Sequence, residues 1–209
     1  MDARSPAARL AYTAGSPFSR MARVCIREWA LPVEEAEVAF PPPPETFAVN
    51  PLGQVPLLTV GDEAVFPTLL ILERLWSMAG RPRAAYDDAR DRQVLVTLLQ
   101  AGDALVAAYY QRWAGLGPVR PNLIGYDPAE RHLGRVRATL AWLEPRSGEL
   151  GAAVTLPGTV LACLLLWAAA RDGLGSPVPP GLGEVVGRLQ EREAFKATEP
   201  PPWRPSGTA

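Results

Sequence analysis

The sequence predicts a small α/β domain followed by an all-helical domain. Short apolar runs typical of strands, separated by Gly, Pro and Asp turns, stop near residue 80. From residue 87 onward, apolar residues recur at helical spacing. The segment between them, Arg81-Pro82-Arg83-Ala84-Ala85, has the composition of a linker. We therefore expect domains at residues 1–80 and 87–209.

The first domain is predicted to have the order β-α-β-loop-β-β-α. Gly15-Ser16-Pro17 separates the first strand from the first helix, and Pro17 suits a first helical turn because its missing N–H has no partner there. Pro41–Pro44 cannot be helical and predicts an extended loop. The strands are expected at residues 9–14, 33–40, 56–60 and 64–66, and the helices at 17–29 and 67–80.

The second domain is predicted to contain helices at 87–113, 127–143, 156–171 and 183–195. The most apolar stretch, 160–170, has about half of the roughly 20 residues needed to cross a bilayer, so it indicates a buried helix. Thr155 is expected to cap that helix, with Gly158 at the position where a capping box has an acid. The tail 200–209 is rich in Pro, Gly and Ser and is expected to be loosely held.

Composition argues against several classes of function. The net charge is −1 and no basic run is present, so neither nucleic acid nor an anionic membrane is an expected partner. No signal peptide is apparent, and Cys25 and Cys163 lie far apart in apolar contexts, which favours a reducing cytoplasm. His132, the only histidine, is expected at the surface, so neither a catalytic triad nor a metal site is predicted.

Three stretches carry a resemblance to a known family: residues 12–24, residues 50–75, which begin with Asn50-Pro51-Leu52-Gly53-Gln54-Val55-Pro56 before a hairpin, and residues 193–198. With the order of the elements, they resemble bacterial, serine-type members of the glutathione transferase superfamily. The resemblance implies a thioredoxin-like domain followed by a helical bundle. It also implies glutathione as co-substrate and a homodimer.

The resemblance assigns glutathione binding to the segment around Val55-Pro56. In the family the corresponding proline is cis, which an X-Pro bond tolerates at a cost of about 0.5–1 kcal/mol. The main chain of Val55 would pair with the cysteinyl part of glutathione, and Gln54 would contact the glycyl end. The alternative is that Val55-Pro56 only begins an edge strand.

Ser16 matches the family's catalytic serine. It lies where the first strand turns into the first helix, where unpaired N–H groups and the helix dipole stabilise a thiolate. Ser16 would donate a hydrogen bond to the glutathione sulfur, and Phe18 is assigned to ligand binding beside it. Ser19 and Tyr12 are alternatives for the thiol contact. Ser16 is also suited to cap the helix, and the two roles are compatible.

Pro67-Thr68 departs from the family pattern. Most members have an acid and a serine there that bind the γ-glutamyl group. Thr68 keeps the hydroxyl at a helix start suited to a carboxylate, but Pro67 supplies no acid. Loss of one charge-assisted hydrogen bond costs roughly 1.5–3 kcal/mol, so weaker glutathione binding is expected.

The predicted function is a glutathione transferase-like enzyme that activates the thiol with Ser16 for attack on a small hydrophobic electrophile. Candidate residues for the electrophile site are Tyr109, Tyr110, Trp113 and Trp167, which core packing explains equally well. The alternative is a non-catalytic binding or assembly protein that keeps the fold, which Pro67 and Gly158 favour. A cysteine-type oxidoreductase is not favoured, because Cys25 lies well inside the first helix.

Overall fold

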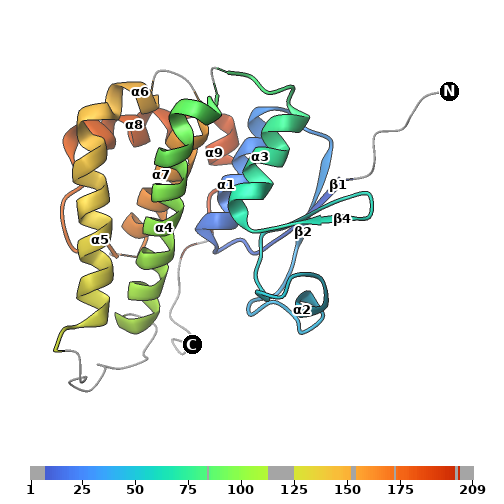
Figure 1. Cartoon of the computed structure of the whole chain (residues 1–209), viewed down its shortest axis with the longest axis horizontal. Helices are drawn as coiled ribbons and strands as arrows, with labels where there is room; N and C mark the ends of the chain where they lie inside the picture. The colour runs from blue at the N-terminus through green and yellow to red at the C-terminus, as the bar shows by residue number, and fades with distance from the viewer. Residues whose placement is uncertain are drawn as a thin grey trace. The chain divides into compact units, whose positions relative to one another are not determined.

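The computed structural model describes residues 8–83, 85–112, 125–151, 154–171, 173–200 and 202. It divides into two compact units: one comprises Met1–Tyr86 and Glu191–Ala209, the other Asp87–Gln190. The first has strands and helices, and the described part of the second has helices alone, which confirms the predicted fold class (Figure 1). The described residues 191–200 group with the α/β unit, while the domain limits 1–80 and 87–209 stay a prediction.

The α/β unit is built on a four-stranded mixed sheet with strand order β2-β1-β3-β4. Strand β1 pairs in parallel with β2 and antiparallel with β3, which pairs antiparallel with β4. In β1, Ala8, Leu10 and Tyr12 are buried while Arg9 is exposed, so the alternating side chains of the strand separate core from solvent. The strands are β1 (Ala8–Tyr12), β2 (Val33–Glu37), β3 (Leu57–Val60) and β4 (Glu63–Val65).

Two helices of this unit, α1 (Pro17–Glu28) and α3 (Thr68–Met78), pack side by side (Figure 1). Met21 and Val24 of α1 and Leu75 of α3 are completely buried, and burying such a side chain contributes about 1.5–3 kcal/mol. The unit also has α2 (Thr46–Val49) and, from the C-terminal segment, α9 (Glu193–Lys196), which packs against α1.

Helix α1 also buries arginines, and each has an identified partner. The Arg23 Nε lies 2.6 Å from a carboxylate oxygen of Glu35 in β2, and its guanidinium stacks on the Tyr12 ring at 4.1 Å. The Arg20 Nη2 donates to the main-chain oxygen of Phe195 in α9 at 3.0 Å. Because a buried charge is tolerated only when paired, these contacts explain how a charged helix lies inside the unit.

The helical unit is organised around α7, whose residues are almost all buried. Helix α4 packs against α5 and α7, and α8 packs against α7. None of the helices in the described residues is long and apolar enough to span a membrane. The elements are α4 (Asp88–Arg112), α5 (Pro128–Leu143), the 3-10 helix η1 (Glu144–Arg146), α6 (Ser147–Gly151), α7 (Leu156–Ala169) and α8 (Pro180–Gln190).

Thr155 caps α7 as predicted, and the structure gives a reason for Gly158. The Thr155 Oγ1 accepts from the Gly158 N–H at 3.0 Å. A Cβ on Gly158 would collide with the main-chain oxygen of Leu150. The close approach of α6 and α7 therefore requires glycine at the position where the capping box would place an acid.

The prediction of one helix over 183–195 is wrong. Helix α8 ends at Gln190, and α9 begins at Glu193. Between them Arg192 has an extended backbone (φ −76°, ψ 145°) and forms an ion pair with Glu28 of α1.

The short helices α2 and α6 were not predicted, because four or five residues are too few to show helical periodicity in the sequence.

His132, expected at the surface, is half-buried in α5 with its Nδ1 buried. Cys25 and Cys163 are buried free thiols, in agreement with their apolar contexts. Of the tail 200–209, only residues 200 and 202 are among those described.

We expect Asp91→Asn to destabilise the helical unit at neutral pH. Burial raises the pKa of the Asp91 carboxyl, but hydrogen bonds from Arg90 and from the Asp87 N–H outweigh it, so the net pKa is lowered from 3.8. A carboxylate with a lowered folded pKa stabilises above the unfolded pKa, and the gain disappears as pH falls through the folded pKa. In urea unfolding, the variant should therefore have a free energy of unfolding about 1–3 kcal/mol below that of the wild type at pH 7. The difference should shrink below about pH 4. Asp62→Asn, in an exposed turn, is the control; a loss independent of pH would contradict the expectation.

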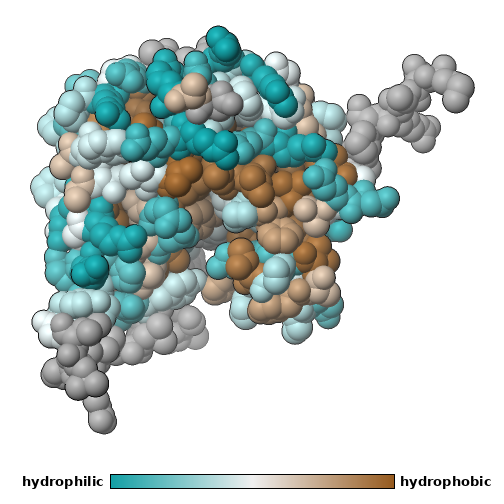
Figure 2. Space-filling view, viewed as in Figure 1, coloured by the Kyte–Doolittle hydropathy of each residue, from teal (hydrophilic) through white to brown (hydrophobic). Residues whose placement is uncertain are grey.

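Exposed apolar side chains gather around α2 in the α/β unit. Phe40, Phe47, Val49 and Leu52 have exposed fractions of 49–66%. Figure 2 shows brown surface over this segment. Large apolar side chains that gather at a surface mark sites of association more often than isolated ones do.

Candidate functional site

The Asn50–Pro56 loop is organised by a buried asparagine. The Asn50 side chain is 1% exposed; its Nδ2 donates to the Gln54 main-chain oxygen at 2.8 Å, and its Oδ1 accepts from the Leu52 N–H at 3.0 Å. The Asn50 main-chain oxygen accepts from the Gly53 N–H at 2.8 Å. The sequence analysis predicted no role for Asn50. Two signals were present: Asn-Pro favours a turn, and an Asn side chain often accepts a hydrogen bond from the main-chain N–H two residues later, which is called an Asx-turn.

Gly53 is required within this loop for two reasons. Its φ is +60°, a conformation that side chains disfavour. The Phe47 ring also covers the position that a Cβ would occupy. The loop therefore has one defined conformation, which presents Gln54 to solvent and buries Pro56.

The Val55–Pro56 peptide bond is cis, as the resemblance implied. Pro56 leads into β3, whose first residue, Leu57, pairs with Ala11 of β1. Among the described residues, none forms a hydrogen bond with the Val55 N–H or C=O. The half-exposed Val55 main chain can therefore pair with an extended ligand in the way of an added strand.

Ser16 caps the first helix. Its Oγ accepts from the Ser19 N–H at 3.2 Å, and its side chain is partly exposed. A hydroxyl that accepts one bond still has its own O–H to donate, so Ser16 can cap α1 and donate to a bound anion simultaneously. Phe18 lies half-buried in the same turn.

The two alternatives to Ser16 are less accessible. Ser19 is completely buried, and its Oγ accepts from the Thr13 N–H at 3.3 Å. Tyr12 is 9% exposed, and its ring lies under the Arg23 guanidinium. Of the three hydroxyls, that of Ser16 is the one best exposed to a ligand at the start of α1.

Pro67 and Thr68 form the start of α3. Pro67 is the N-cap residue and provides no side-chain cap, and the first turn contains no acid. Its main-chain oxygen accepts from Leu70 and Ile71 at 3.0 and 3.2 Å. Within the described residues, no acceptor is recorded for the N–H groups of Thr68 and Leu69. These N–H groups, with the half-buried Thr68 hydroxyl, can bind a carboxylate.

The sheet register brings these three segments to one end of the sheet. The end of β1 pairs with the start of β3 (Ala11 with Leu57), and the end of β4 pairs with the start of β3 (Val65 with Leu58). Ser16 follows β1, Val55 precedes β3 and Thr68 follows β4, so all three lie at that end. Helices α1 and α3 both begin there, and the partial positive charges of their N-termini favour an anionic ligand.

The helical unit contains an aromatic cluster that includes three of the four residues predicted for the electrophile site. The ring centroids of Tyr109 and Trp167 are 5.1 Å apart, and those of Tyr109 and Tyr110 are 5.6 Å apart, both edge to face. Arg171, which sequence reasoning missed, lies over the Trp167 ring at 4.5 Å. Trp113 lies outside the described residues.

Two cavities of about 400 and 320 Å³ lie in the helical unit, and none of these aromatic residues lines them. The larger is bounded by Arg90, Asp91, Arg146 and Thr155, and the smaller by mostly apolar residues between Leu165 and Val178. Among the described residues that line them, none was predicted as a site residue. No group of three or more potential metal ligands occurs in the described residues.

Comparison with known proteins gives a family match for the N-terminal part and a fold match for most of the chain. Residues 15–77 match the family model of the glutathione S-transferase N-terminal domain. A glutathione S-transferase from Methylobacillus flagellatus KT, solved with glutathione bound, superposes with a TM-score of 0.77 at 23% identity, over 93% of this chain and 100% of the other. A glutathione transferase family member from Pseudomonas fluorescens Pf-5, also with glutathione, gives 0.77 at 22% identity over the same shares.

A third solved structure, glutathione S-transferase III in its apo form, superposes with a TM-score of 0.70 at 22% identity, over 95% of this chain and 100% of the other. No curated protein sequence matches the chain. The predicted architecture, a thioredoxin-like domain followed by a helical part, is confirmed. Residues 15–77 thus match a glutathione S-transferase N-terminal domain, and the chain shares the fold of these solved glutathione transferases.

Proposed function

We propose that the protein is a glutathione transferase in which Ser16 activates the glutathione thiol. The observation that carries the proposal is the meeting of Ser16, Val55 and Thr68 at one end of the sheet, where two helices begin. The glutathione bound in the structures from M. flagellatus and P. fluorescens supports glutathione as the co-substrate.

Each part of glutathione has a counterpart in this site. The Val55 N–H and C=O pair with the cysteinyl main chain, and the exposed Gln54 side chain contacts the glycyl end. The γ-glutamyl carboxylate accepts from the Thr68 N–H and hydroxyl at the start of α3. Pro67 supplies no acid for the γ-glutamyl ammonium. The affinity for glutathione is therefore about ten- to hundredfold lower than that of a site with an acidic residue at this position.

The cysteinyl sulfur then lies near the start of α1. The Ser16 hydroxyl donates a hydrogen bond to it, and the dipole of α1 favours its negative charge. Both effects stabilise the thiolate over the thiol and lower the thiol pKa. The thiolate sulfur attacks an electrophilic carbon of a small hydrophobic substrate; a C–S bond forms, the bond from that carbon to a leaving group such as halide breaks, and the leaving group departs with the bonding electron pair. Tyr109, Tyr110 and Trp167 stay the candidates for contact with that substrate.

Isothermal calorimetry with glutathione, followed by conjugation assays with a panel of electrophiles, tests the proposal. We expect binding in the micromolar to millimolar range and turnover with at least one activated aryl halide. Absence of binding at millimolar glutathione would contradict it. Ophthalmic acid, which has a methyl group in place of the thiol, is the control for thiol-independent binding.

Asn50→Ala is expected to raise the Kd of glutathione at least tenfold. It removes both side-chain hydrogen bonds that fix the loop and leaves the Gln54 oxygen without its donor. Losing buried hydrogen bonds costs about 1–3 kcal/mol. Calorimetry measures the Kd, with Asn50→Asp, which keeps the Oδ1 acceptor, as an intermediate variant. An unchanged Kd for Asn50→Ala would show that the loop conformation does not contribute to binding.

The second candidate is a non-catalytic glutathione-binding or assembly protein, and Pro67 in place of the acid favours it. Binding of glutathione with an unperturbed thiol pKa and no turnover would support this alternative. A thiolate signal from bound glutathione would exclude it.

We also propose that the protein is a homodimer that works in the cytoplasm. The exposed apolar side chains around α2 support an association surface. Light scattering should give twice the chain mass of 22.5 kDa, and Phe47→Ser should shift the protein toward a monomer. A wild-type mass of one chain would contradict the dimer.

A further inference from the structure

The turn between β1 and α1 is closed by a ring of three hydrogen bonds. The Ser16 N–H donates to the Thr13 main-chain oxygen at 3.1 Å, and the Ser19 N–H donates to the Ser16 Oγ at 3.2 Å. The Thr13 N–H donates in turn to the Ser19 Oγ at 3.3 Å. This hydrogen-bonded ring of Thr13, Ser16 and Ser19 joins the end of β1 to the first turn of α1, and it fixes where the Ser16 side chain lies.

Ser19 occupies the position from which a capping box reaches back, but its side chain binds a different residue. In a capping box the side chain at N3 accepts from the N–H of the N-cap residue. Here Ser16 is the N-cap and Ser19 is at N3, yet the Ser19 Oγ accepts from the Thr13 N–H, three residues before the cap. The Ser19 side chain therefore holds the whole turn against the helix.

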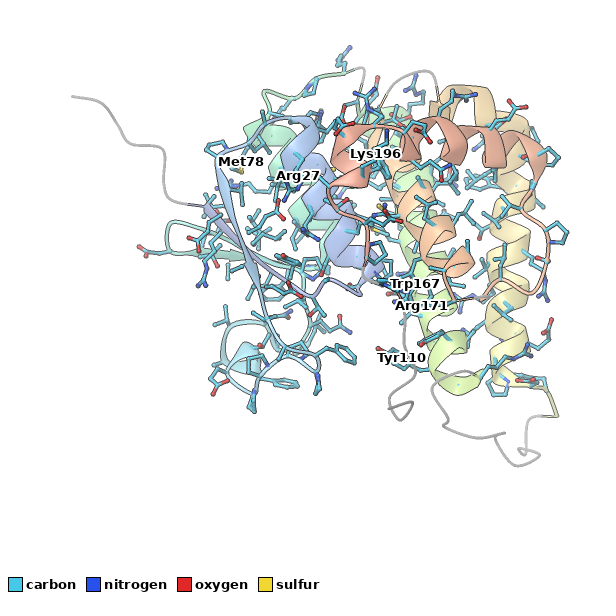
Figure 3. The ribbon with its side chains drawn as sticks, turned by 180° about the vertical axis from the view of Figure 1, so that it is seen from behind. Arg27, Met78, Tyr110, Trp167, Arg171 and Lys196 are labelled. Atoms are coloured by element: carbon cyan, nitrogen blue, oxygen red, sulfur yellow. The ribbon has the colours of Figure 1, made fainter. Side chains whose placement is uncertain are left out.

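Ser19 is completely buried, although alanine is the better helix former and a buried hydroxyl is unfavourable without a hydrogen bond. Figure 3 shows α1 from behind, with Arg27 labelled in its last turn; Ser19 belongs to the first turn, at the opposite end. A completely buried side chain is out of reach of a ligand. Any influence of Ser19 on the site must therefore pass through the residues that it holds.

The hydrogen-bonded ring uses the Ser16 Oγ only as an acceptor. Each of its three donors is a main-chain N–H. Within the part of the chain that the structure describes, no acceptor is recorded for the Ser16 O–H, and the side chain is partly exposed. Because one side of the oxygen is taken by the Ser19 N–H, the O–H must point elsewhere. The ring thus restricts both the position and the direction of the hydrogen bond that Ser16 donates.

We propose that Ser19 is a positioning residue, whose buried hydroxyl closes the ring that directs the Ser16 O–H toward the glutathione sulfur. Ser19 does not touch the substrate and acts through Ser16. Misplacement of a catalytic group by about 1 Å can cost about 10²-fold in rate, so a small movement of Ser16 is enough to matter. This inference rests on the proposed function for the identity of the ligand, whereas the ring itself needs only residues of the α/β unit.

Ser19→Ala opens the ring and leaves the Ser16 side chain in place. We expect kcat for conjugation to fall about tenfold and the thiol pKa of bound glutathione to rise, as titrated by thiolate absorbance. The Kd of ophthalmic acid, which has no thiol, should stay within about twofold, because Val55 and Thr68 are unchanged. Cys25→Ala is the matched control: it also removes one buried atom from α1 and should leave kcat and the thiol pKa unchanged. Unchanged kcat and thiol pKa in Ser19→Ala, or an equal loss of ophthalmic acid binding, would overturn the inference.

A double-mutant cycle shows whether Ser19 acts through Ser16. In a Ser16→Ala background, Ser19→Ala should change neither the thiol pKa nor kcat further, because no O–H is left to direct. A residue that only stabilises the helix would have the same effect in both backgrounds. Equal effects with and without the Ser16 hydroxyl would therefore overturn the positioning role.

Amide hydrogen exchange without ligand, followed by NMR, separates this inference from the proposed function. In Ser19→Ala the N–H groups of residues 16 and 19 should exchange faster, because the ring that holds them is open. Faster exchange, in a protein whose wild type shows no thiolate with bound glutathione, would support the positioning of Ser16 by Ser19 and overturn the transferase. A wild-type thiolate signal, with unchanged exchange at both N–H groups, would support the transferase and overturn the role of Ser19.

Discussion

Replacing Ser16 by alanine is expected to lower kcat/KM for conjugation at least 100-fold. Removal of a single donor to a developing or bound anion typically costs about 10²–10³ in rate. The Ser16 hydroxyl is partly exposed at the start of α1, and its role as cap acceptor leaves its own O–H to donate. The thiol pKa of bound glutathione should rise accordingly. Ultraviolet absorbance of the thiolate, titrated with pH, measures it directly.

Two further substitutions separate the thiol contact from the helix cap. Aspartate caps helices about as well as serine, whereas alanine loses about 1 kcal/mol. Ser16→Asp should therefore keep stability but lose activity, because a carboxylate has no proton to donate and repels the thiolate. Ser16→Thr should keep much of both. If Ser16→Ala leaves the thiolate signal unchanged, the thiol contact passes to Ser19 or Tyr12.

The order of elements in the α/β unit could be predicted because each element has a local signal. Pro17 and Pro67 lie at the starts of α1 and α3, and the Gly61-Asp62 turn lies between β3 and β4. The break between α8 and α9 was not predicted because it has no such local signal. The apolar spacing from Leu182 to Phe195 is compatible with one helix, and a pairing of Arg192 with a residue 164 positions away accompanies the break.

The candidate site could be proposed from sequence where its motif is continuous, and not where tertiary contacts decide. Ser16, Gln54, Val55 and Thr68 belong to short motifs, so the resemblance could assign them. The role of Asn50 depends on its burial and on two hydrogen bonds that only the folded loop defines. Arg171 follows the end of α7 and meets Tyr109 of α4 through packing alone, which no local pattern encodes.

Phe195→Ala is expected to be the most destabilising single change, with a loss of about 3–5 kcal/mol in the free energy of unfolding of the α/β unit. Phe195 is completely buried, and Arg20 of α1 lies 5.7 Å from its ring centroid. The Phe195 main-chain oxygen also accepts from Arg20 at 3.0 Å. Truncation leaves a cavity beside a buried charge, so packing and charge pairing weaken together.

Amide hydrogen exchange shows which unit this change affects. Protection should fall in α1 (Pro17–Glu28) and remain in α5 (Pro128–Leu143), because residues 191–200 pack with the α/β unit. Lys196→Ala is the control in the same short helix: Lys196 is exposed and forms surface ion pairs with Glu191 and Glu193, so the expected change is within about 0.5 kcal/mol. Loss of protection confined to α5 would instead assign the C-terminal segment to the helical domain.

Since Arg20 lies one turn beyond Ser16, a loosened α1 should also weaken glutathione binding. The C-terminal segment thereby stabilises the helix that positions the proposed catalytic serine.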